Sequence, residues 1–132
     1  MRSDEELKQS YKIHIDNEII HIHIIYDLAD SNENTRRMEL IREKLFNIFN
    51  MDKNKQYKII VEILYIARGH ISNEARKIWI ELAKNKQVVK SAVVGQNIFL
   101  QVAANFIINT AGRNESIHWF TEKKKALEWL KE

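Results

Sequence analysis

Residues 57–65 have the sequence YKIIVEILY, an apolar run interrupted by one lysine and one glutamate. Such a run is typical of a strand in a parallel sheet whose two faces are both covered by other elements. The flanking residues support this interpretation. Residues 33–50, and the segment that follows Ser72, repeat apolar side chains at steps of three and four, as an amphipathic helix does. A strand between two such helices predicts an α/β fold.

The same alternation continues in both directions along the chain. Strands are expected at 11–16, 19–26, 88–94 and 116–120, with a turn at Asn17-Glu18, a helix from Ile98 to near Gly112, and a last helix capped by Thr121. The order β-β-α-β-α-β-α-β-α predicts a single mixed five-stranded sheet with right-handed crossovers. We therefore expect one domain over residues 11–132. Residues 1–10 form its N-terminal lead-in, which is either frayed or a short helix.

Composition narrows the function classes. The 132 residues include no Cys, which excludes thiol nucleophiles, disulfides and cysteine-based metal sites. The three glycines lie far apart, so the chain lacks the glycine-rich phosphate-binding motifs and the nucleophile elbow. These absences favour a protein that is not an enzyme and that needs no cofactor. The apolar runs are short and the first ten residues are charged, which predicts a cytoplasmic protein without membrane insertion.

The charge pattern gives little support for a nucleic-acid partner. The net charge is +3, and the basic residues of the second half are scattered along the chain without interleaved aromatic residues. Single-strand binding proteins combine a basic groove with aromatic stacking platforms. We therefore expect no nucleic-acid partner.

The loop after the central strand is the richest candidate site. In open α/β sheets, ligands collect at the carboxyl ends of the parallel strands. Arg68, His70 and Ser72 lie in this loop, and Glu74 and Arg76 follow in the first turn of the next helix. A phosphate on Ser72 would gain from the free N–H groups of that helix. The alternative interpretation is that Ser72 only caps the helix and Gly69 only permits a turn.

Three histidines form a second candidate site on the hairpin. With a two-residue turn at 17–18, His14 faces His21 across the strands, His23 lies diagonal to His14, and all three point to one side of the sheet. Three histidine ligands with one open position are a geometry that can hold zinc. The alternative is a polar, partly solvated face without a metal. The unpaired edge of this hairpin also offers a route to a homodimer.

Aromatic residues in the helical stripes allow two interpretations. Trp79, Phe99 and Phe106 lie on apolar stripes that we expect to pack in the core. A pocket that holds a small, lipid-like apolar ligand between helices and sheet would have the same sequence pattern.

Two segments resemble a known family. The segment Ile71-Ser-Asn-Glu-Ala-Arg76 and the ending Phe120-Thr-Glu-Lys-Lys-Lys-Ala-Leu-Glu-Trp-Leu130, together with the element order, are similar to small bacterial STAS-like proteins. Those proteins are grouped with the anti-sigma-factor antagonists and the lipid-binding CRAL-TRIO domains. The resemblance implies a regulatory module that is not an enzyme and that binds a protein partner. It also implies phosphorylation at Ser72, although the Asp-Ser-Ser-Gly type of loop is absent.

The leading hypothesis is therefore a STAS-like interaction module. Its partner would bind through Arg68, His70, Ser72, Glu74 and Arg76, with Ser72 as the switch. A carrier of a small apolar ligand near Trp79, Phe99 and Phe106 is the first alternative. A metal-binding protein using His14, His21 and His23 is the second alternative.

Overall fold

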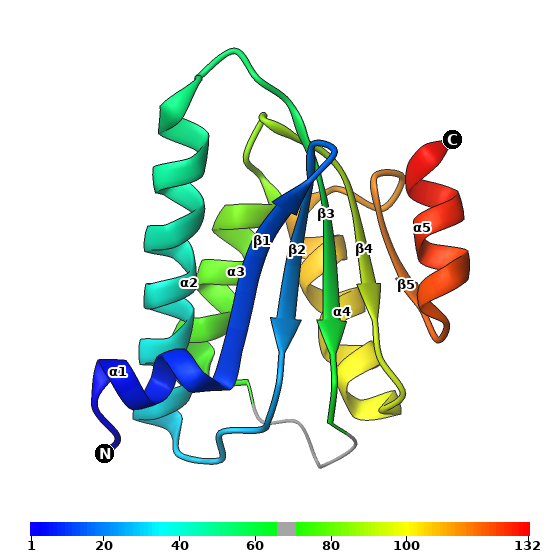
Figure 1. Cartoon of the computed structure of the whole chain (residues 1–132). Coiled ribbons are helices and arrows are strands. Elements are labelled where there is room, and N and C mark those ends of the chain that lie inside the picture. Colours follow the sequence, from blue (N-terminus) through cyan, green and yellow to red (C-terminus); the bar gives the residue numbers. More distant parts are fainter. Residues whose placement is uncertain (66–70) are drawn as a thin grey trace.

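The computed structural model describes residues 1–65 and 71–132, and it shows a five-stranded sheet in the order β1-β2-β3-β4-β5 (Figure 1). The strands are β1 (Tyr11–Asp16), β2 (Ile19–Ile24), β3 (Tyr57–Ile63), β4 (Val88–Val94) and β5 (Ile117–Phe120). The helices are α1 (Asp4–Leu7), the 3-10 turn η1 (Lys8–Ser10), α2 (Ser31–Met51), α3 (Asn73–Ala83), α4 (Ile98–Ala111) and α5 (Lys123–Lys131). β1 is antiparallel to β2, and the other neighbours are parallel. The predicted mixed α/β sheet is confirmed.

The hairpin forms in the predicted register. Asn17 and Glu18 have φ of 50° and 67°, the left-handed backbone of a type I′ turn, which matches the twist of the two flanking strands. His14 therefore pairs with His21, and Lys12 pairs with His23. Because side chains alternate along a strand, this register sends the three histidines to one face and Ile20, Ile22 and Ile24 to the other.

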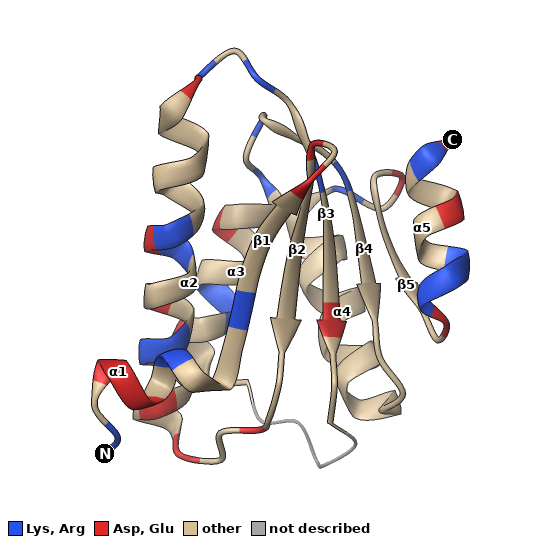
Figure 2. Cartoon of the chain, viewed as in Figure 1, with Lys and Arg blue, Asp and Glu red and all other residues tan. Residues whose placement is uncertain are grey.

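Residues 1–10 adopt the short-helix form of the expected lead-in. Ser3 and Glu6 form a reciprocal capping box at the start of α1. Leu7 is fully buried with Leu28 and Leu40, and Arg36 of α2 forms an ion pair with Asp4 at 2.8 Å. Figure 2 shows the acidic residues of α1 beside the basic residues of α2. The N-terminal segment is thus fastened to α2 by both apolar and charged contacts.

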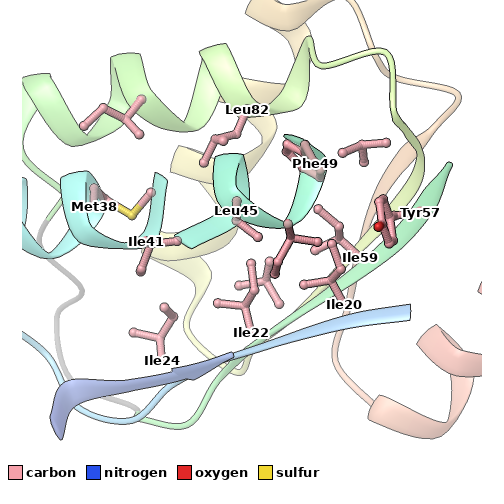
Figure 3. Close-up of a cluster of buried hydrophobic side chains, with 14 of the residues drawn as sticks. Ile20, Ile22, Ile24, Met38, Ile41, Leu45, Phe49, Tyr57, Ile59 and Leu82 are labelled. Carbon is pink, nitrogen blue, oxygen red and sulfur yellow. The ribbon is translucent and has the colours of Figure 1, made fainter. Parts of the chain in front are cut away.

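The two faces of the sheet are covered differently. One face lies under α2, α3 and α4, and we call it the helix-covered face. On it, side chains of α2 and α3 pack over Ile20, Ile22 and Ile59, as Figure 3 shows. The opposite face, which we call the α5 face, packs Ile60, Ala92 and Val94 against Ala126 and Leu130 of α5. Within the described residues, α5 contacts mainly β3, β4 and β5, and the three histidines lie on the same face over β1 and β2.

Two sequence expectations about helices are wrong. The last helix has Glu122 at its N-cap position, with no side-chain cap, where Thr121 was expected. α4 ends as predicted at Gly112, whose φ of 68° is left-handed. However, Phe99 and Phe106 of α4 do not pack in the core, because α4 turns Leu100, Ile107 and Ile108 toward the sheet instead.

Candidate functional site

Ser72 caps α3, as predicted, and its hydroxyl lies inside the structure. The Oγ accepts a hydrogen bond from the backbone N–H of Ala75 at 3.1 Å. The same Oγ lies 2.6 Å from the hydroxyl oxygen of Thr35, and the backbone N–H of Ser72 donates to Oδ1 of Asn34 at 2.9 Å. Ser72 is 7% exposed. The start of α3 is therefore joined to the first turn of α2 by side-chain contacts.

The other predicted residues of this loop are placed only in part. Arg68 and His70 lie outside the described residues. Glu74 is exposed and forms an ion pair with Lys77 at 3.1 Å. Arg76 is half-buried, and its Nε is buried without a hydrogen-bond partner in the described part of the chain. Sequence reasoning did not identify Thr35 as a contact of Ser72, because nothing local in a helix marks a partner 37 positions away.

α4 presents a large apolar surface to solvent. Ile98, Phe99, Val102 and Phe106 are 68%, 71%, 65% and 55% exposed. Their spacing of one, three and four residues places them along one side of the helix. The helix has the sequence IFLQVAANFIINTA, which contains no charged residue, and it is uniformly uncoloured in Figure 2. Isolated exposed apolar residues are ordinary, but a group of four on one side of a helix makes this side a candidate interaction surface.

The start of α4 and the start of α3 lie at the same edge of the sheet. α3 follows β3 and α4 follows β4, and these two strands are parallel. The carboxyl ends of the two strands, and hence the first turns of both helices, share one edge (Figure 1). The two helices also contact one another. α4 and the site that the sequence predicted around Ser72 therefore begin at the same edge of the sheet.

An apolar cavity of about 120 Å³ lies between the helix-covered face and α2, α3 and α4. Trp79 lines it, as predicted, together with Leu100 and Ala104 of α4. Phe99 and Phe106 do not line it, because they point to solvent on the other side of α4. Of the three residues predicted for a ligand pocket, Trp79 therefore lines this cavity and the two phenylalanines lie outside it.

A buried arginine stands at one end of this cavity. Arg37 lines the cavity and donates from Nη1 to the backbone carbonyl of Tyr26 at 2.7 Å. Burial lowers the pKa of Arg37, and its contact with the hydroxyl of Tyr65 acts in the opposite direction. Burial also raises the pKa of Tyr65. These two side chains, with Asn34 and Ser91, are the polar groups in a mostly apolar lining.

The three histidines lie together on the α5 face. The rings of His14 and His21 are stacked with centroids 4.6 Å apart, and one ring nitrogen from each of the three histidines lies within 4.8 Å of the others. Oε1 of Glu62, on β3, lies 3.6 Å from Nδ1 of His23 and 2.9 Å from Nζ of Lys123. Burial lowers the pKa of His21 and of His23, and their mutual repulsion with His14 lowers both further.

His118 has the surroundings expected of a structural histidine. Its ring stacks on Trp129 of α5 with centroids 4.3 Å apart, and Nε2 lies 3.0 Å from the carbonyl oxygen of Asn114. It lies apart from the other described histidines, on β5, which is separated from β2 by two strands.

Within the described residues, no helix combines the length and the apolar character that crossing a membrane requires. Comparison with curated proteins finds no match. The model of one family, a domain of unknown function named DUF7793, matches residues 13–132. That match runs from β1 to the last residue and includes every candidate site described above. The chain therefore belongs to the DUF7793 family.

Proposed function

We propose that the protein is a STAS-like interaction module without enzymatic activity, which binds a protein partner through the exposed side of α4 and the adjacent start of α3. The observation that carries this proposal is the exposure of Ile98, Phe99, Val102 and Phe106 on one side of α4. Phenylalanine side chains buried at the centre of an interface are among the groups that dominate protein association.

The energetics favour a covered surface. Full burial of one such side chain contributes about 1.5–3 kcal/mol of favourable free energy. Covering all four would therefore make a large favourable contribution to binding. Because α4 has no charged residue, the matching surface of the partner should be apolar and uncharged. Binding should therefore depend only weakly on salt concentration, in contrast to binding guided by charge.

The composition of α4 favours a protein partner over a membrane surface. Helices that lie in the membrane interface carry lysine and arginine on their polar side, where these residues contact anionic headgroups. The polar residues of α4 are Gln101, Asn105, Asn109 and Thr110, all uncharged. The apolar side of α4 consequently lacks the basic flank that a lipid surface would require.

Ser72 would supply the switch in this proposal. A phosphate on its Oγ would displace the hydroxyl of Thr35, which lies 2.6 Å away, and would loosen the contact between α2 and the start of α3. Since this contact lies at the same edge as the start of α4, a change there would alter the docking surface. Phosphate transfer requires the Ser72 hydroxyl to open to solvent first, because Ser72 is buried.

The test compares complexes of the native protein and of a surface variant. Untagged protein is isolated from its host and its intact complexes are measured by native mass spectrometry, alongside the double variant Phe99→Ser with Phe106→Ser. We expect a defined complex with the native chain that is absent with the variant. Met51→Ser, which changes an exposed apolar residue on α2, is the matched control and should retain the complex. Identical spectra for all three proteins would contradict the proposal.

The cavity supports a second candidate function, the binding of a small apolar ligand. Its volume of about 120 Å³ is close to that of engineered cavities of about 150 Å³ that bind benzene. It is smaller than the range of about 300–1,000 Å³ typical of sites for larger ligands, which favours a small ring over a long acyl chain. NMR titration with benzene should shift signals of residues around Trp79, and a lack of shifts would reject this candidate.

A further inference from the structure

We propose that His14, His21 and His23 form a binding site for a divalent metal ion such as Zn²⁺, the ion that the test below uses. In this site, Glu62 positions the ring of His23. This inference is independent of the proposed function, because the cluster lies on the α5 face and α4 lies beyond the other face of the sheet.

The hairpin places the three ligands with little freedom. His14 and His21 are directly paired, and His23 is two residues beyond His21 on the same strand and the same face. The type I′ turn sets this register, and a shift by one residue would send the histidines to opposite faces. The backbone positions of the ligands are thus fixed by the hydrogen bonds of the sheet.

The ring nitrogens are close enough to converge on one ion. They lie within 4.8 Å of one another. Nitrogens that bind one tetrahedral zinc at about 2.0–2.1 Å are about 3.3 Å apart, so each ring must move by about an ångström. The rings are now stacked nearly parallel, with 7° between His14 and His21. Rotation about the Cβ–Cγ bond, which is a soft torsion, would direct their lone pairs toward a shared ion.

Glu62 places a carboxylate next to His23, an arrangement that is common for metal-binding histidines. Metal ligands of this type usually donate the N–H of the second ring nitrogen to a carboxylate, which fixes the tautomer and the ring orientation. Oε1 of Glu62 is buried, lies 3.6 Å from Nδ1 of His23, and makes no well-directed hydrogen bond within the described residues. The two atoms are just beyond hydrogen-bond distance, so a small movement of the ring would let the carboxylate hold a proton on Nδ1 and leave the lone pair of Nε2 for the cation.

The charges around the cluster allow a cation to bind. Lys12 pairs with His23 across the hairpin, and Lys123 of α5 lies beside Glu62. Asp16 lies on the same face two residues beyond His14, and it acts on His21 as a negative charge. The two lysines are thus balanced by the carboxylates of Glu62 and Asp16. Three histidine ligands would leave one coordination position open to water.

The experiment is a Zn²⁺ titration of the untagged full chain by isothermal calorimetry. We expect saturable binding of one ion per chain, and a loss of affinity of at least about 10-fold in each of His14→Gln, His21→Gln and His23→Gln. His14 is exposed, so His14→Gln should fold normally, which circular dichroism verifies. The matched control is His118→Gln, which changes a histidine outside the cluster and should bind as the native chain does. An absence of saturable binding, or unchanged affinity in His14→Gln, would overturn the site.

The role of Glu62 has its own test. Glu62→Gln should weaken Zn²⁺ binding by about 10–100-fold and should change the tautomer of His23, which ¹⁵N NMR of the imidazole reports. Lys123→Gln removes the ion pair but keeps the carboxylate, so it should retain the tautomer of the native chain. If Glu62→Gln leaves both affinity and tautomer unchanged, the positioning role is wrong.

Discussion

α3 and α4 are neighbouring helices on the same face of the sheet, and they use their apolar residues differently. α3 buries Ala75, Ile78 and Leu82 and exposes charged residues such as Glu74 and Lys77. α4 buries Leu100, Ile107 and Ile108, yet also exposes four large apolar residues, among them Phe99. The apolar residues of α3 suffice for its packing, whereas α4 carries apolar residues beyond those that packing uses. That excess is the basis for assigning α4 to a partner.

The largest expected effect contrasts an inward residue of α3 with an outward residue of α4. Ile78→Ala removes a side chain that is 6% exposed, and we expect a loss of about 2–5 kcal/mol in the free energy of unfolding. Phe99→Ala changes a side chain in solvent, and we expect a change of no more than about 0.5 kcal/mol. Urea denaturation of the two variants measures both values. A large loss in Phe99→Ala would show that this side of α4 contributes to folding.

The cap of α3 gives the next effect. Ser72→Ala removes the acceptor for the N–H of Ala75 and the contact with Thr35, and we expect a loss of about 0.5–2 kcal/mol. Thr35→Val is the matched control, because it removes the hydrogen bond between Thr35 and Ser72 and leaves the cap. Ser72→Ala should therefore unfold at a lower midpoint temperature than Thr35→Val. The reverse order would mean that the interhelical hydrogen bond stabilises the fold more than the cap does.

Filling the cavity should act in the opposite direction. Ala104 of α4 lines the cavity, so Ala104→Leu should fill part of it and raise the free energy of unfolding by about 0.5–2 kcal/mol. It should also abolish any binding of benzene. Ala103→Leu, at the neighbouring position that does not line the cavity, is the control and should give neither result. Destabilisation by Ala104→Leu would indicate that the space is too narrow for added methyl groups.

The smallest effect concerns pH. The pKa values of His21 and His23 lie below their ordinary value of 6.5, because of burial and mutual repulsion with His14. The unfolded chain therefore binds more protons, and stability should fall as pH drops from above 6.5 through the folded pKa values. Both side chains are partly solvated, so we expect less than about 1 kcal/mol. His21→Gln should flatten this dependence. A slope in His21→Gln equal to that of the native chain would contradict this origin.

The sequence was sufficient for features set by local pattern. The alternation of β1 and β2 and the two-residue turn at Asn17-Glu18 determine which histidines meet, so the pairing of His14 with His21 could be predicted. The cap at Ser72 follows equally from its position before an apolar periodic segment.

Features set by long-range packing could not be read in this way. α4 has apolar residues on both sides, so periodicity alone cannot say whether Phe99 or Ile107 faces the sheet. The contact of Thr35 with Ser72 joins residues 37 positions apart, and the cavity depends on how closely three helices approach the sheet. Each of these depends on the relative placement of whole elements, which no local pattern records.

The most direct measurement of the claim about α4 is site-specific photo-crosslinking in the host cell. A benzophenone amino acid replaces Phe99 in one protein and Met51, an exposed apolar residue of α2, in another. We expect irradiation to join the chain labelled at position 99 to one protein of defined mass, and the chain labelled at position 51 to none. A product of the same mass and yield from both positions, or none from position 99, would contradict the assignment of α4 as the docking surface.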